Sequence, residues 1–322
     1  MDWLLIVFGL LLLLTGGDVL VRGAVGIAKR FKVSPLIIGL TIVSFGTSAP
    51  ELMVSLQAAL NGNPDIAIGN VVGSNIANLA LVLGLTVLIF PIVIDKNTLR
   101  IDWPVMMFAS LLFWFFLSDG VISFLDGLVF VIILVAYLAF LFYNSSKNLN
   151  PEPEELEESS KYRWMNSLTV LLSFVALGCL GLVFGADFLV DGASNIARDF
   201  GISDHIIGVT IVAFGTSVPE LATSCIAAFK KQTDISVGNL IGSNIFNILA
   251  ILGITSLVTP INLQEMDVLS RDIYWFLAIA FVILPFTIFG MKLQRWKGLL
   301  LFLAYVVFIC ISAGLISLPF PC

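Results

Sequence analysis

The 322 residues are 59% hydrophobic and only 12% charged, and their mean hydropathy is +1.05. This apolar share excludes a soluble globular domain of the same length and indicates a chain that lies in a lipid bilayer. The net charge of −6 comes partly from an acidic run, Glu152 to Glu158, between two apolar stretches. Such a run is typical of a solvated linker, with a regulatory ion-binding loop as the alternative.

Ten apolar stretches are long enough to cross about 30 Å of hydrocarbon as helices, which takes roughly 17 to 25 residues each. Barrel strands would be shorter and would alternate apolar with polar residues, so we expect an all-α membrane protein with ten transmembrane helices. The first stretch lacks a basic start and a cleavage site, which favours a retained span over a signal peptide. The stretches cover residues 3–28, 35–60, 65–92, 103–118, 121–143, 164–190, 203–228, 233–259, 272–290 and 297–317.

The chain contains an internal repeat. Shifting the sequence by 169 residues aligns 16–92 with 185–261 without a gap, and about 40 of the 77 aligned positions are identical. Each half holds five spans, an odd number, so equivalent spans run in opposite directions across the membrane. This predicts two inverted-topology five-helix repeats with broken helices at the midplane. The repeats cover residues 1–143 and 164–322, and the acidic linker covers 144–163.

Basic residues predict the orientation of the chain. When loops are assigned alternately to two sides, loops after odd-numbered spans hold thirteen Lys and Arg residues, and the other side holds Arg198 and Arg271. Arg22 lies within the first span and is left out. Cytoplasmic loops carry the Lys/Arg excess, so we expect a cytoplasmic linker and both termini outside, in a multi-pass protein of the cell (inner) membrane.

Spans two and seven each carry a Gly-Thr-Ser-x-Pro-Glu motif at mid-span, ending at Glu51 and Glu220. Pro50 and Pro219 have no backbone N–H, so the helix is expected to break and leave carbonyl groups free for a cation. Each glutamate then lies in the first turn of the second half-helix, where the helix dipole favours a carboxylate. The hydroxyl groups beside them belong to Thr47, Ser48, Thr216 and Ser217.

Spans three and eight carry a Gly-Ser-Asn-Ile-x-Asn motif. At a spacing of four residues, Ser74 and Asn78 share a helix face, as do Ser243 and Asn247, and nearby glycines allow close approach to the glutamate motif. The pooled ligands are all oxygen atoms. Calcium binds about six to eight oxygens, and one divalent cation neutralises two carboxylates. The sequence therefore favours calcium over magnesium.

Other polar residues have plainer interpretations. Asn70, Asn75, Asn239 and Asn244 are interpreted as packing residues, with Asn75 on a different helix face from Asn78 and Asn247. Asp18 and Asp187 match across the repeat and lie toward the ends of their predicted spans, which favours a structural or gating role. His205 is interpreted as a surface residue. The cysteines have no metal-like spacing and are interpreted as packing residues: Cys179, Cys225, Cys310 and Cys322.

At these motifs the sequence resembles the cation/calcium antiporter superfamily, and most closely its prokaryotic sodium/calcium exchanger branch. The resemblance covers the whole chain. It implies that Glu51 and Glu220 bind calcium together with the backbone carbonyls of Thr47 and Thr216. It implies sodium sites formed by the two glutamates, the carbonyls of Ser44 and Ala213, and the side chains of Ser48, Ser74, Ser217 and Ser243, with Asn78 and Asn247 lining the centre.

Two departures from the family pattern bear on function. Some relatives carry an aspartate where this chain has Asn247, which leaves the sodium stoichiometry and proton linkage open. Ser44 replaces a small apolar residue, which matters little if only its carbonyl is a ligand.

Three functions remain open on the sequence. Sodium-driven calcium antiport by alternating access, without a cofactor, is the leading interpretation. Calcium/proton antiport is the near alternative, because two buried glutamates can also carry protons. An intramembrane enzyme that uses the glutamates as acid and base is remote, since no nucleophile or cofactor motif accompanies them. The driving ion, stoichiometry and oligomeric state are left open.

Overall fold

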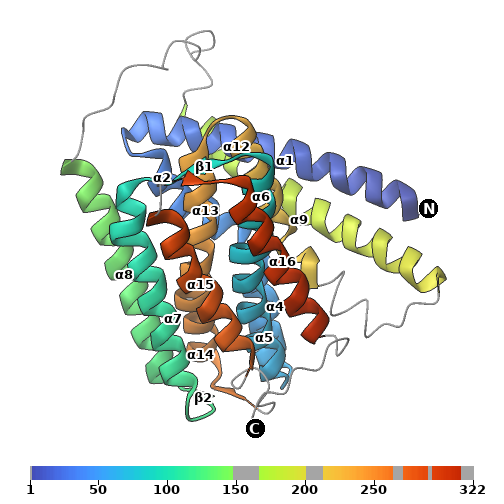
Figure 1. The fold of residues 1–322 in the computed structure, drawn as a ribbon, viewed down its shortest axis with the longest axis vertical. Coiled ribbons are helices and arrows are strands. Elements are labelled where there is room, and N and C mark those ends of the chain that lie inside the picture. Colours follow the sequence, from blue (N-terminus) through green and yellow to red (C-terminus); the bar gives the residue numbers. More distant parts are fainter. Residues whose placement is uncertain (1, 148–166, 201–212, 264–270, 289–291, 313–322) are drawn as a thin grey trace.

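The first half of the chain folds as a series of helices interrupted by short irregular turns. The computed structural model describes residues 2–147, 167–200, 213–263, 271–288 and 292–312 (Figure 1). The elements of the first half are α1 (Asp2–Phe31), α2 (Pro35–Ile38), the π-helical η1 (Gly39–Val43), α3 (Ser44–Thr47), α4 (Ala49–Leu60), α5 (Pro64–Ile76), the π-helical η2 (Ala77–Val82), α6 (Leu83–Ile89), β1 (Ile92–Val93), the π-helical η3 (Thr98–Asp102), α7 (Trp103–Leu117), β2 (Val121–Ile122) and α8 (Phe124–Lys147).

The described part of the second half repeats much of this order. Its elements are α9 (Leu168–Asp199), α11 (Ala213–Gly215), α12 (Val218–Phe229), α13 (Thr233–Phe246), the π-helical η7 (Asn247–Leu252), α14 (Gly253–Val258), β3 (Ile261–Asn262), α15 (Ile273–Ile288), β4 (Lys292–Leu293) and α16 (Arg295–Ser312). The helix α9 continues nine residues beyond the predicted end of its span at residue 190, so Asp187 lies in its interior and not toward its end. Asp18 likewise lies in the interior of α1.

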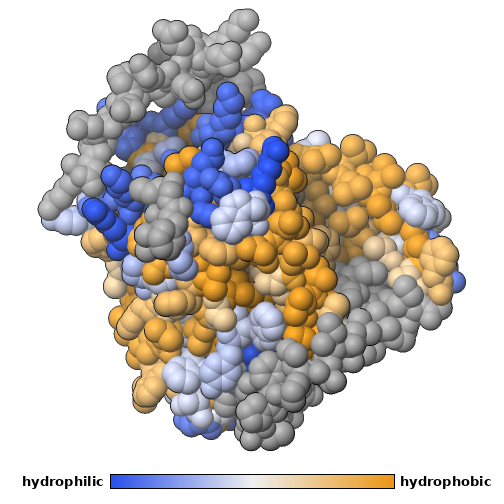
Figure 2. Space-filling model, in the orientation of Figure 1, coloured by the Kyte–Doolittle hydropathy of each residue, from blue (hydrophilic) through white to orange (hydrophobic). Residues whose placement is uncertain are grey.

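The helices have the lengths and surfaces of membrane spans. Among the described residues, seven helices are long and apolar enough to cross a bilayer, or eight if the bent pair Pro35–Thr47 and Ala49–Leu60 forms one span. The apolar helices α12 and α15 are shorter. The prediction of an all-α membrane protein is therefore confirmed at this level. Ten complete spans are not seen, because part of the seventh falls on residues 201–212, outside the described residues, and α15, at the ninth, is one of the shorter apolar helices. Hydrophobic residues cover the side of the molecule and hydrophilic residues gather at its ends (Figure 2).

Close glycine contacts join α1 to α9 in an antiparallel pair that projects from the rest of the bundle (Figure 1). A Cβ atom at Gly9 would lie 2.7 Å from the carbonyl oxygen of Gly185, and one at Gly16 would lie 3.0 Å from that of Gly178. Because no side chain separates them at these points, the two backbones pack directly against each other. In the repeat, Gly9 corresponds to Gly178 and Gly16 to Gly185, so each contact recurs with its partners exchanged.

Contacts that recur with exchanged partners also join other helices of the bundle. Gly84 of α6 packs against Gly298 of α16, and Gly253 of α14 packs against Gly127 of α8. Two short antiparallel strand pairs, β1 with β4 and β2 with β3, follow the same rule. The sequence does not predict these strands, because two residues are too few to produce an alternating pattern. The large apolar core lies between these elements, around α5, α6, α7, α13 and η7.

Candidate ion-binding site

Both glutamate motifs break their helix, at the serine that precedes the Ala-Pro or Val-Pro pair. Ser48 has φ −87° and ψ 6°, and Ser217 has φ −92° and ψ 1°, so neither continues the α-helix. The segment Pro35–Thr47 meets α4 at an angle of 46°. Each proline lies at the start of the following helix, where its missing N–H costs no hydrogen bond. The predicted break is therefore observed, at Ser48 and at Ser217.

The breaks place Glu51 and Glu220 in the first turns of α4 and α12. Both side chains are fully buried. Both oxygens of Glu51 and the Oε2 atom of Glu220 have no hydrogen-bond partner in the protein. Because buried carboxylates without a counter-charge are strongly disfavoured, this pair suits a cation.

A direct contact joins the two motifs. The Ser48 hydroxyl donates a hydrogen bond to Oε1 of Glu220, at 3.2 Å. The serine at the helix break in the first half of the chain thus contacts the glutamate of the second half. A ligand set drawn from both halves needs this proximity.

Polar side chains of α5, η2, α13 and η7 add further oxygen atoms to the buried region. Ser74, Asn78, Ser243 and Asn247 are all buried. Each carries at least one oxygen without a hydrogen-bond partner in the protein, as does Ser217. Hydroxyl and amide oxygens are ligands that calcium and sodium accept, so this set fits a dehydrated cation. The structure places all of these predicted residues in the buried interior.

A buried hydrogen bond joins asparagines of the two halves. Asn247 is the first residue of η7, and its Nδ2 atom donates a hydrogen bond to Oδ1 of Asn75 at 3.0 Å. The expectation that Asn75 lies apart from Asn247 on another face is therefore wrong. The expectation rested on faces within a single helix, whereas the contact comes from a helix of the other half of the chain.

Ser44 uses its side chain as well as its backbone. Its hydroxyl donates to the carbonyl of Gly39 at 2.7 Å and lies 3.0 Å from the carbonyl of Asn239 in α13. The interpretation that the serine matters only through its own carbonyl is thus incomplete. A small apolar residue would leave both carbonyl groups without this donor.

Asn70 and Asn239, midway along α5 and α13, join each of these helices to its neighbour. Asn70 donates to the hydroxyl of Ser55, and Asn239 donates to that of Ser224, at 2.9 and 3.2 Å. Asn239 also accepts a hydrogen bond from the hydroxyl of Thr47 at 3.1 Å. These are interhelical contacts of the packing kind, and they hold α4 and α12 in place beside the glutamates.

The structure describes some of the remaining predicted residues and not others. Thr216 lies in the break between α11 and α12, and Ala213 is the first residue of α11. Cys179, Cys225 and Cys310 are free thiols, and no group of three or more His, Cys, Asp or Glu residues suited to a metal ion occurs within the described ranges. His205, Cys322 and most of the acidic linker lie outside the described residues.

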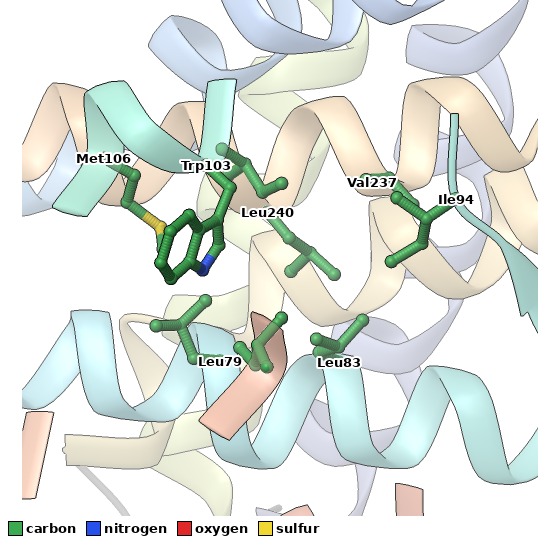
Figure 3. A pocket seen from close by; sticks show the side chains of 9 residues that line it. Leu79, Leu83, Ile94, Trp103, Met106, Val237 and Leu240 are labelled. Atoms are coloured by element: carbon green, nitrogen blue, oxygen red, sulfur yellow. The ribbon is translucent and has the colours of Figure 1, made fainter. Parts of the chain in front are cut away.

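A small cavity elsewhere in the bundle has the wrong chemistry for an ion. It lies between η2, α6, α7, α13 and α15 and is drawn in Figure 3. The indole N–H of Trp103 at its edge already donates to the carbonyl of Ala280. The cavity is lined by Leu79, Leu83, Ile94, Trp103, Met106, Val237, Leu240, Ile241 and Ile283. Without oxygen ligands it is part of the apolar packing.

Comparison with known proteins identifies the family. The family model described as "Sodium/calcium exchanger protein" matches residues 1–143 and 170–314. The chain belongs to the sodium/calcium exchanger family. The resemblance to the cation/calcium antiporter superfamily is thereby confirmed.

Individual relatives match this chain along most of their length. The chain is 33% identical to the sodium/calcium exchanger MaX1 of Methanosarcina acetivorans, over 96% of this chain and 98% of MaX1. It is 38% identical to the inner membrane protein YrbG of Escherichia coli, over 83% of each chain. The solved structure of the sodium-calcium exchanger NCX_Mj superposes with a TM-score of 0.81 at 34% identity, covering 97% of this chain and 98% of NCX_Mj.

Membership in this family decides two further predictions. Its members are ion exchangers, so the expectation that the chain is not an enzyme is confirmed, and the intramembrane enzyme is excluded. The family and the apolar helices together identify a multi-pass membrane protein.

Proposed function

We propose that this protein exchanges calcium for sodium across the membrane by alternating access, with Glu51 and Glu220 as ligands that both ions share. The observation that carries the proposal is the pair of fully buried carboxylates in the first turns of α4 and α12. One calcium ion neutralises both, and sodium ions that occupy the same oxygens displace it. Competition for shared ligands is what couples the two fluxes.

The proposed ligand set extends beyond the glutamates. Calcium is coordinated by the two carboxylates and by the backbone carbonyls of Thr47 and Thr216. Sodium uses the carboxylates, the carbonyls of Ser44 and Ala213, and the side chains of Ser48, Ser74, Ser217 and Ser243. Asn78 and Asn247 line the centre. The buried oxygens without protein partners in this region support the assignment.

The architecture proposed for this cycle is a pair of inverted five-helix repeats, residues 1–143 and 164–322. The reciprocal contacts of α1 with α9, of α6 with α16 and of α14 with α8 support it. In inverted-repeat transporters the two halves exchange conformations around a site at the midplane. We further propose that the linker is cytoplasmic and that both termini lie outside.

Calcium-45 uptake into proteoliposomes tests the function. An outward-directed sodium gradient should drive uptake, whereas an imposed pH gradient at equal sodium should not. Uptake driven by pH alone would replace the proposal with calcium/proton antiport. Two relatives, MaX1 and NCX_Mj, are named as sodium/calcium exchangers, and this supports exchange driven by sodium over exchange driven by protons.

A further inference from the structure

An ion pair joins α1 to the end of α12. The Lys230 ammonium group pairs with Oδ1 of Asp18, and it also lies 3.4 Å from the Asp18 carbonyl oxygen. The other carboxylate oxygen of Asp18 pairs with Nε of Arg22 at 2.7 Å. The side chains of Asp18 and Lys230 are 34% and 26% exposed, so solvent screens this pair less than a pair on an open surface.

The pair acts on the helix that carries one of the two buried glutamates. Lys230 caps the carboxyl end of α12, and Glu220 lies in its first turn. Beside the pair, Gly17 of α1 packs against Ile226 of α12. Because α12 is a short continuous helix, a force on Lys230 is transmitted along it to the region of Glu220. In Figure 1, α1 crosses the bundle next to α12.

The corresponding contact in the other half is missing. By the repeat offset of 169 residues, Asp18 corresponds to Asp187, Arg22 to Asp191 and Lys230 to Asn61. Among the described helices, α4 has no more than marginal contact with α1 or α9, although its counterpart α12 packs against both. A mirrored arrangement would bring two carboxylates toward an uncharged amide, where no cation holds them.

We propose that Asp18 and Lys230 are positioning residues of the transport cycle, whose ion pair favours the arrangement with α1 against α12 over its mirror image. The inference rests on the proposed alternating access. The pair touches no proposed ion ligand and acts through the position of α12. Because this ion pair is present in only one of the two similar halves, the two arrangements differ in free energy.

The backbone conformation allows two kinds of variant: the native ion pair can be removed, and a lysine can be added at the corresponding position of the other half. Asn61 caps α4 with φ −83° and ψ 5°, nearly the conformation of Lys230 at the end of α12, φ −80° and ψ 9°. A lysine therefore fits at position 61 without backbone strain. Asn61→Lys supplies the missing cation opposite Asp187 and Asp191, while Lys230→Gln and Asp18→Asn remove the native pair.

The populations can be read from distances between nitroxide labels. Labels at Leu14 of α1 and Phe229 of α12, both exposed, report the separation of these helices by pulsed electron paramagnetic resonance, in protein whose native cysteines have been replaced. Lys230→Gln and Asp18→Asn should each lower the ratio of the present arrangement to its alternative by about twofold to fivefold, as an ion pair of this exposure allows. The double variant should change it little further, because both changes remove the same contact between α1 and α12, whereas the Asp18–Arg22 pair lies within α1.

The mirrored and control variants complete the experiment. Asn61→Lys should shift the ratio in the same direction, because it stabilises the alternative arrangement. Lys231→Gln removes the same charge from the next, exposed residue and should leave the ratio unchanged. Unchanged distances in Lys230→Gln and Asp18→Asn, or equal shifts in Lys231→Gln, would overturn the inference. Calcium-45 flux on the same preparations tests the exchange function separately, since the distances can be measured whether or not calcium is transported.

Discussion

Asn247 and Asn75, which belong to different halves of the chain, are joined by a hydrogen bond from Nδ2 of the former to Oδ1 of the latter. Both side chains are fully buried. A buried amide that loses its partner costs more than the bond itself contributes, because the group left behind cannot be hydrated. The pair therefore ties η7 to the end of α5, beside the proposed ligands.

This contact predicts strong coupling between the two asparagines. Asn75→Ala and Asn247→Ala should each destabilise the folded protein by about 1–3 kcal/mol, since each leaves a buried polar group unpaired. The double variant should be clearly less destabilised than the sum of the single variants. Thermal unfolding in detergent measures all three. Strict additivity would mean that the side chains do not interact.

Removal of either carboxylate should abolish exchange. Glu51→Gln and Glu220→Gln each leave one charge opposite a divalent ion, and loss of one partner in a buried charged site typically costs about 3–5 kcal/mol. Sodium-driven calcium-45 flux should fall by about a hundredfold or more, while expression and insertion remain normal. Near-normal flux in either variant would remove that glutamate from the site.

Asp102 offers a matched control for the glutamates. It is a buried acid outside the site, 2% exposed, and accepts a hydrogen bond from the Tyr137 hydroxyl at 3.0 Å. Asp102→Asn keeps an acceptor for that hydroxyl. It removes a buried carboxyl group without removing a proposed ligand, so flux should persist.

The two serines near the first break should separate stability from transport. Ser44→Ala removes hydrogen bonds to backbone carbonyls and should destabilise the fold by about 0.5–1.5 kcal/mol, with calcium affinity nearly unchanged. Ser48→Ala removes the hydroxyl that contacts Glu220 and should weaken sodium-driven flux more than stability. Unfolding temperature and half-saturating calcium concentration, measured for both variants, decide the assignment. If Ser44→Ala mainly weakened transport and Ser48→Ala mainly lowered stability, the roles assigned to the two serines would be exchanged.

Single-cysteine labelling checks the orientation. In a background without native cysteines, Ser160→Cys in the linker should react with an impermeant maleimide only after the membrane is opened. Ser118→Cys, in the exposed turn between α7 and α8, should react in intact cells. Labelling of the linker from outside would mean that the orientation inferred from basic residues is reversed.

The fold was largely predictable because its main signals are local. Apolar length, the 169-residue repeat and the proline after Thr-Ser located the helices and the breaks at Ser48 and Ser217. Contacts between helices distant in sequence were not predictable. The hydrogen bond between Asn75 in α5 and Asn247 at the start of η7 joins the two halves, and a spacing within one helix does not indicate which residue of another helix it meets. The hydroxyl contacts of Ser44 were missed because one acceptor, Asn239, lies on a helix distant in sequence and the other, Gly39, is reached across the π-helical η1.

The exchanged partners of Gly9, Gly16, Gly178 and Gly185 also bear on how this protein arose. A surface on which position i meets position j, and j meets i, is self-complementary, as in a homodimer with a two-fold axis. Two copies of one unit with such a surface, inserted in opposite directions, would bury it without a second gene product. Joining the copies in one chain would fix their relative orientation and leave the two halves free to acquire different residues.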